Sequence, residues 1–140
     1  MTLVDSNIFM YATGREHPFK KRAAAFLEKV AEGVVEAAID AEVLQEILHR
    51  YYALDRGTEG GMVYDTARIL FPEVLAVTGE VMDAARQLMD ADLHASMDAR
   101  RRLMARDALH AAVVRVYGLE SITTFDRDFE AIAGLRRVEP

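Results

Sequence analysis

The sequence contains no cysteine. A disulfide framework and a thiolate metal site are therefore both excluded, and the chain suits a reducing compartment such as the cytoplasm. No apolar run approaches the roughly 18 residues that a transmembrane helix needs. A secretory signal would place a basic segment before an apolar one, and the N-terminus has no such segment. We therefore expect a cytoplasmic protein that neither spans nor binds a membrane.

Linker-like composition is also missing, because the chain has no Gly/Ser-rich or Pro-rich tract, no internal repeat and no low-complexity segment. At 140 residues, with 51% hydrophobic and 29% charged side chains, it is long enough for one domain with a sizeable core and too short for two. We expect a single domain over residues 1–140.

Basic residues are outnumbered by acidic ones, 17 to 23, which gives a formal net charge of −6. This balance argues against a protein that coats nucleic acid by bulk charge, but not against an enzyme that acts on nucleic acid. Positive charge is concentrated at residues 20–22 and 100–106. A solvated helix face would explain either cluster equally well.

Apolar periodicity predicts strands that alternate with helices, which is typical of an α/β fold with a parallel sheet. The expected strands end near Asp5 and cover residues 34–39, 74–77 and 121–125, with an edge strand around 137–138. The expected helices cover residues 8–12, 18–32, 41–51, 62–71, 78–89 and 106–117, and Gly57, Gly60 and Gly61 are expected to lie in a loop.

Asp5 follows the first apolar run directly, at the position where a first strand would end. Ligands and catalytic groups of parallel α/β sheets gather outside the carboxyl ends of the strands. An aspartate at this position can equally cap the next helix. Asp5 alone is therefore weak support for a functional site.

Three further acids fall at comparable positions. Glu46 lies on the border of the apolar stripe of the helix that Asp40 caps, whereas Glu42 on the same helix points away from the stripe and is expected to face water. Asp107 stands in the first turn of a helix that is apolar on nearly every side, where the helix dipole favours an ionised carboxylate. Asp126 follows the strand predicted over residues 121–125.

Four acids without cysteine or a clear histidine pair suit a hard cation, and Mg²⁺ or Mn²⁺ is the natural choice. Such an ion activates water and stabilises charge on a phosphodiester, so hydrolysis of a nucleic-acid backbone is the leading chemistry. No Ser/His/Asp or Cys/His arrangement is legible, and no GxxxxGK[ST] phosphate loop occurs.

Four motifs occur in one order along the chain: DSN at 5–7, VLQEI with Glu46, RDALHAA with Asp107, and T-x-D-x-x-F from Thr124 through Asp126 to Phe129. In this order the sequence resembles the PIN-domain ribonucleases, specifically the VapC-type toxins, over essentially its whole length. The resemblance implies an α/β/α sandwich around a parallel sheet, a Mg²⁺- or Mn²⁺-dependent ribonuclease acting on RNA, a cognate antitoxin and a homodimer. It also implies that Asp5, Glu46, Asp107 and Asp126 are the catalytic and metal-binding residues, supported by Asn7 and Thr124.

Some assignments stay open at this point. Asp128 could replace Asp126, which we prefer because it follows Thr124 by two residues and lies nearer the strand end. His110 shares a helix face with Asp107 and is expected to be an interior histidine with its hydrogen bonds satisfied. Residues 90–106 are difficult to align, and an exposed arm, a substrate clamp and a partner surface are all compatible with them.

Two other functions compete with the nuclease. Phosphotransfer domains of the haloacid-dehalogenase or response-regulator kind also place an aspartate after strand one. The first kind needs a second aspartate where this chain has Asn7, and both use a late lysine, whereas the lysines here are Lys20, Lys21 and Lys29. The more serious alternative is a PIN-like module that binds a partner or RNA without cleaving it.

Overall fold

The computed structural model describes residues 1–95 and 103–140. The helices that the periodicity predicted are present, and so are the predicted strands other than the one over residues 74–77. The elements are β1 Thr2–Val4, α1 Ser6–Thr13, α2 Lys20–Ala31, β2 Ala37–Ala38, α3 Ala41–Ala53, α4 Gly57–Leu70, α5 Gly79–Ala95, α6 Ala105–Val116, β3 Ser121–Thr123, the 3-10 helix η2 Arg127–Ala131 and β4 Arg137–Val138.

The four strands form one parallel sheet in the order β2-β1-β3-β4, which places β1 next to β3. In this pairing Val4 lies opposite Thr123. The backbone N–H of Asp5 then donates to the carbonyl of Thr123 across 3.1 Å. The residues that follow the two strands, Asp5 and Thr124, are therefore neighbours at the carboxyl edge of the sheet.

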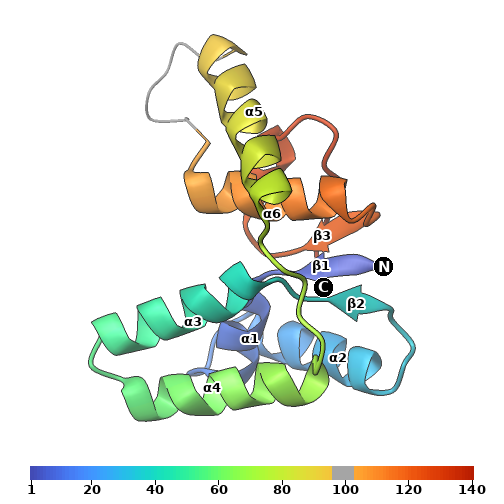
Figure 1. Ribbon diagram of the computed structural model, residues 1–140. Helices are drawn as coiled ribbons and strands as arrows, with labels where there is room; N and C mark the ends of the chain where they lie inside the picture. Colours follow the sequence, from blue (N-terminus) through green and yellow to red (C-terminus); the bar gives the residue numbers. More distant parts are fainter. Residues whose placement is uncertain (96–102) are drawn as a thin grey trace.

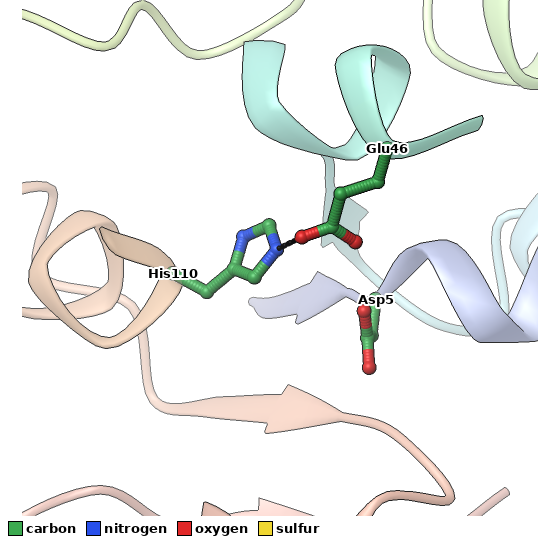
Figure 2. A group of neighbouring side chains, drawn as sticks. All are labelled: Asp5, Glu46 and His110. Atoms are coloured by element: carbon green, nitrogen blue, oxygen red, sulfur yellow. Dashed lines mark hydrogen bonds and ion pairs between the residues drawn. The ribbon is translucent and has the colours of Figure 1, made fainter. Parts of the chain in front are cut away.

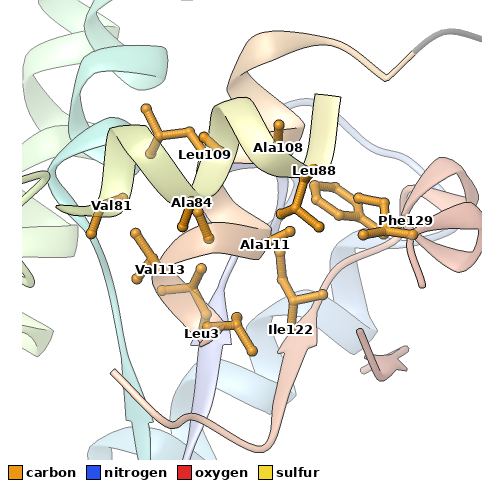
Figure 3. Close-up of a cluster of buried hydrophobic side chains, with 14 residues drawn as sticks. Leu3, Val81, Ala84, Leu88, Ala108, Leu109, Ala111, Val113, Ile122 and Phe129 are labelled. Atoms are coloured by element: carbon orange, nitrogen blue, oxygen red, sulfur yellow. The ribbon is translucent and has the colours of Figure 1, made fainter. Parts of the chain in front are cut away.

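Helices cover both faces of the sheet, with α5 and α6 on one side and α1 to α4 on the other (Figure 1). Successive strand side chains point to opposite faces. Leu3 and Ile122 accordingly join the buried cluster formed with α5 and α6 (Figure 3), whereas Val4 joins the cluster formed with α1 to α4. This arrangement confirms the α/β/α sandwich.

The strand predicted over residues 74–77 is wrong. Only Leu75 pairs with the sheet, through a single parallel bridge to Asp40. Its N–H donates to the carbonyl of Ile39 across 2.9 Å, and its carbonyl accepts from the N–H of Ala41 across 3.1 Å. The chain then enters α5, where Thr78 accepts a hydrogen bond from a first-turn N–H. The segment is a connection with one bridge, because helix entry ends its pairing.

The loop predicted at the glycines is also wrong, because α4 begins at Gly57 and includes Gly60 and Gly61. A Cβ atom added to Gly60 would lie 2.5 Å from the Cβ of Tyr51 on α3. Glycine at position 60 thus lets the two helices approach closely. Local composition indicated a chain reversal, whereas the glycine is needed for helix packing.

The segment that was difficult to align divides into three parts. Residues 90–95 belong to α5, and α6 begins at Ala105. Residues 96–102, with most of the second basic cluster, lie outside the described residues. Within the described ranges, no helix has both the length and the apolar character needed to cross a membrane.

Candidate active site

Asp5 lies at the end of β1 and precedes α1, and only 5% of its surface is exposed. The hydroxyl of Thr124 donates a hydrogen bond to its Oδ2 across 2.5 Å. The same hydroxyl oxygen accepts hydrogen bonds from Nδ2 of Asn7 at 2.9 Å and from the backbone N–H of Asp126 at 3.0 Å. Thr124 therefore joins three of the residues that the sequence placed in the site.

Glu46 reaches the same edge of the sheet from α3, and both of its carboxylate oxygens are held by donors. Oε2 accepts a hydrogen bond from the hydroxyl of Ser6 across 2.5 Å. Oε1 lies 2.9 Å from Nε2 of His110, the contact drawn in Figure 2. The carboxylate of Glu46 is thus oriented by side chains from α1 and α6.

His110 is an interior histidine, as expected, with 1% of its surface exposed. Its Nδ1 lies 2.7 Å from Oδ2 of Asp40, which is fully buried. Oδ1 of Asp40 accepts from the N–H of Val43 and caps α3, also as expected. The link from Asp40 through His110 to Glu46 was not predicted from the sequence. The one available signal was that His110 shares a helix face with Asp107.

Asp107 and Asp126 line the same cleft as Asp5 and Glu46. Asp107 stands in the first turn of α6, and Asp126 precedes η2, where its Oδ1 accepts from the N–H of Asp128 across 2.9 Å. The carboxylate of Asp126 therefore both caps η2 and lines the cleft. Asp128 is exposed and is not among the lining residues.

The cleft has a volume of about 810 Å³. Besides the four acids and Glu16, it is lined by basic or potentially basic side chains, which are Arg15, His17, His49, Arg50, Arg56 and Arg106. Glu46 and Arg50 are one helical turn apart on α3, so along this helix the lining changes from acidic to basic. The arrangement places a carboxylate cluster beside groups that attract anions.

Burial is the largest cause of a raised pKa at two of the acids. It raises the pKa of Asp5 above the ordinary value, and repulsion from Glu46 adds to this, against the opposing influence of His110 and Thr124. The pKa of Asp107 is raised to about 6 by burial and by repulsion from Asp126 and Asp5, with Arg106 and His110 opposing. Ionising both Asp5 and Asp107 is therefore unfavourable unless a positive charge lies between the carboxylates.

The pKa values of Glu46 and His110 are shifted by the contact between these two side chains. Burial raises the pKa of Glu46, but the hydrogen bond and the charge of His110, together with Ser6, lower it to a net value below the ordinary one. Burial lowers the pKa of His110, but the carboxylates of Asp40 and Glu46 raise it well above its usual value. The two carboxylates therefore favour the protonated form of His110.

The expectation that Glu42 faces water is wrong. Its side chain is partly buried. Burial and repulsion from Glu46 raise its pKa, and Arg106 is among the charges that oppose the shift. The start of α6 thus lies near the side of α3 that a helical wheel assigns to solvent.

The donor atoms of the cluster fit a hard divalent cation. Carboxylate oxygens are the preferred ligands of Mg²⁺ and Mn²⁺. In the described part of the chain, Oδ1 of Asn7 is buried without a hydrogen-bond partner, which leaves one further oxygen at the site. Asp5, Glu46 and His110 also offer ligand atoms within 4.8 Å of one another, but both ring nitrogens of His110 already face carboxylates. Oxygen atoms are therefore the available donors.

Residues 2–135 match the PIN domain family. Ribonuclease VapC13 of Mycobacterium tuberculosis is 38% identical to this chain, and the alignment covers 99% of each chain. Among solved structures, VapBC2 from Rickettsia felis, bound to a DNA fragment from its promoter, superposes with a TM-score of 0.77 at 16% identity and covers 99% of this chain and 98% of the other. A toxin-antitoxin complex from Klebsiella pneumoniae gives a TM-score of 0.62 at 19% identity, covering 96% of this chain and 95% of that one.

Proposed function

Since the chain belongs to the PIN-domain family, and within it to the VapC ribonucleases, we propose that it is an endoribonuclease dependent on Mg²⁺ or Mn²⁺. Asp5, Glu46, Asp107 and Asp126 are the proposed catalytic and metal-binding residues. Asn7 and Thr124 support them, since Asn7 donates a hydrogen bond to Thr124 and Thr124 donates one to Asp5.

The observation that carries this proposal is the shared cleft of the four carboxylates and the arginines. Burial, together with repulsion from Asp126 and Asp5, raises the pKa of Asp107. A divalent cation would relieve this repulsion. Arginines beside a cation site are well suited to bind the phosphates of an RNA strand.

The side chains of the protein contribute orientation. Thr124 fixes Asp5, and Ser6 with His110 fixes Glu46, so the carboxylates keep one geometry before substrate binds. A divalent cation bound there would lower the pKa of a coordinated water and stabilise charge on the attacking and leaving oxygens. Arg50 and Arg106 line the cleft and would hold the flanking phosphates.

We also propose that the protein is the toxin of a toxin-antitoxin pair, forms a homodimer and is inhibited by a cognate antitoxin. The similarity of its fold to that of the Klebsiella pneumoniae toxin-antitoxin complex supports this partner. Co-purification with the product of a neighbouring small gene, together with the mass of the complex in solution, tests both parts. A monomer that captures no such product would contradict them.

The cleavage experiment uses total cellular RNA and the purified protein with Mn²⁺, with EDTA, and with the Asp107→Asn variant. Asp65→Asn is the matched control, because Asp65 is an exposed aspartate on α4 outside the cleft. We expect discrete RNA products from the wild type and the control with Mn²⁺ only. Cleavage by the Asp107→Asn variant would overturn the site, and a protein that binds RNA without cleaving it under any condition would favour the non-catalytic module.

A further inference from the structure

A continuous line of three buried or partly buried side chains leads from the interior to the cleft. His110 on α6 contacts Asp40 with Nδ1 and Glu46 with Nε2, at 2.7 and 2.9 Å. We propose that the Asp40–His110 pair is a positioning device for Glu46, and that it thereby determines how tightly the carboxylate cluster binds a divalent cation. The inference rests on the proposed function, since it assigns these two residues a role at the same site.

The position of the imidazole ring is set by the interior of the protein. Asp40 is anchored by its second oxygen, which accepts from the N–H of Val43 in the first turn of α3. The ring is 1% exposed, and the ring of Phe129 lies 6.4 Å from it, centroid to centroid. Packing and Asp40 therefore decide where Nε2 lies, independently of any ligand in the cleft.

Glu46 needs such a constraint more than the shorter acids do. Its side chain has three rotatable bonds, and immobilising a glutamate therefore costs more rotamer entropy than immobilising an aspartate. Ser6 holds one oxygen and His110 holds the other. Without the donor on His110, the carboxylate can rotate about its bond to Ser6 and no longer presents one fixed oxygen to the cleft.

Two other roles for His110 make different demands on the ring. A metal ligand needs a free lone pair on a ring nitrogen, whereas both nitrogens here face carboxylate oxygens. A purely structural histidine would need Asp40 and the apolar neighbours but not Glu46, which lines the cleft. The contact of His110 with Glu46, a cleft residue, therefore distinguishes a positioning residue from a purely structural one.

Two amide variants separate the two hydrogen bonds of the ring. The amide nitrogen of His110→Gln can take the place of Nε2 and retain the contact with Glu46. The amide nitrogen of His110→Asn can take the place of Nδ1 and retain only the contact with Asp40. Each variant removes the imidazole and one hydrogen bond, so the two are matched for charge. His110→Gln gives up the contact with Asp40, which is fully buried, and His110→Asn gives up the contact with Glu46 at the cleft, so His110→Gln is expected to lose more stability.

The test is calorimetric titration of Mn²⁺ into wild type and both variants, on protein shown by circular dichroism to be folded. We expect His110→Asn to bind Mn²⁺ about 10- to 100-fold more weakly, as for other partners that orient metal ligands, and His110→Gln to stay within a few-fold of the wild type. Equal affinities in the two variants would overturn the proposal. If both matched the wild type, the link would be purely structural, and if both were weakened equally, the imidazole itself would bind the metal.

A second measurement does not depend on metal and keeps this inference separate from the proposed function. Crystal structures of the two variants should show the carboxylate of Glu46 unmoved in His110→Gln and displaced in His110→Asn. An unmoved carboxylate in both would refute positioning even if Mn²⁺ binds. A wild type that binds no Mn²⁺ would refute the metal-dependent function and the role in metal affinity. Asp40→Asn serves as a third variant if His110→Asn does not fold, because its amide oxygen can still cap α3 while the charged partner of the ring is lost. We expect weaker Mn²⁺ binding from it, and a wild-type affinity with an unmoved Glu46 would remove Asp40 from the positioning role.

Discussion

The hydroxyl of Thr124 donates to Oδ2 of Asp5 across 2.5 Å and thereby connects the ends of β3 and β1. A hydroxyl has one hydrogen, so while it is donated to Asp5 the oxygen can only accept from Asn7 and Asp126. Because the amide of Asn7 and the backbone N–H of Asp126 can only donate, the hydrogen of the hydroxyl is left for Oδ2 of Asp5. Thr124 is the residue that orients this carboxylate.

Thr124→Val is expected to lower the rate of RNA cleavage about 10- to 100-fold, since valine has the shape of threonine but cannot hold Asp5 in place. Thr124→Ser retains the hydroxyl and should keep most of the activity. Single-turnover cleavage with saturating Mn²⁺ measures the difference. The control is Thr66→Val, because Thr66 bonds a carbonyl of its own helix away from the cleft. Equal rates for the valine and serine variants would contradict the role of the hydroxyl.

Asp107→Asn should abolish cleavage and stabilise the metal-free protein. The asparagine removes a carboxylate that burial and the neighbouring acids make costly to ionise. Solvent screening at this partly exposed side chain limits the gain to about 1 kcal/mol, or about 3 °C in Tm. Thermal unfolding with EDTA measures it. An unchanged or lower Tm would show that Asp107 is not under repulsion.

The same shift predicts a pH dependence. The pKa of Asp107 is about 6 in the folded protein and 3.8 as the ordinary value, so the folded state binds this proton more tightly and loses stability as pH rises between these values. The Tm advantage of Asp107→Asn over the wild type, both metal-free, should therefore be absent near pH 3.5 and full above pH 6.5. A constant advantage over this range would assign the effect to packing.

Protons should also compete with the cation. Below about pH 6 the affinity for Mn²⁺ should fall with pH, by at most about tenfold per unit for this one proton. Titrations at pH 5, 6 and 7 measure the slope. An affinity that is equal at the three values would argue against Asp107 as a ligand.

Asp126 and Asp128 can be distinguished directly. Asp126 lines the cleft and Asp128 does not, so Asp126→Asn should lose most of the cleavage activity and Asp128→Asn should keep it. Asparagine can still accept the hydrogen bond that caps η2, which preserves the local fold. Initial cleavage rates of the two variants decide the question, and the reverse result would make Asp128 the fourth acid.

Arg50→Gln should weaken RNA binding at every sequence alike and reduce the salt slope of binding by about 1, as expected for one lost phosphate contact. Binding to a short RNA is measured in EDTA at several salt concentrations. Arg86→Gln is the matched control, because Arg86 is exposed on α5 outside the cleft. The same salt slope in both variants would exclude Arg50 from the RNA path.

Several strands and helix caps of this protein could be predicted from its sequence because they depend on local interactions. The apolar runs around Leu3 and Ile122 gave two strands of the sheet, and the caps Asp40 and Thr78 were found because a helix cap lies within three residues of its partner. Asp5 was placed at a strand end for the same reason. In each case the determining contacts are made by neighbours in the chain.

The predictions from the sequence were wrong where a residue's environment depends on residues far away in the sequence. Glu42 was assigned to solvent because a helical wheel does not include the start of α6, which packs nearby. Gly60 was assigned to a loop because its reason, the close approach of Tyr51, exists only once α3 and α4 pack together. Residues 74–77 were assigned to a strand although only Leu75 finds a partner.

The sequence alone thus determined the order of strands and helices apart from residues 74–77, and it determined the short-range caps. It also identified four acids that belong together by their resemblance to a family. Tertiary structure decided how those acids are held. Thr124 meets Asp5 across 119 residues of sequence, and His110 meets Glu46 across 64. Periodicity and capping report interactions within a few residues, whereas these contacts depend on which strands pair and which helices share a face of the sheet.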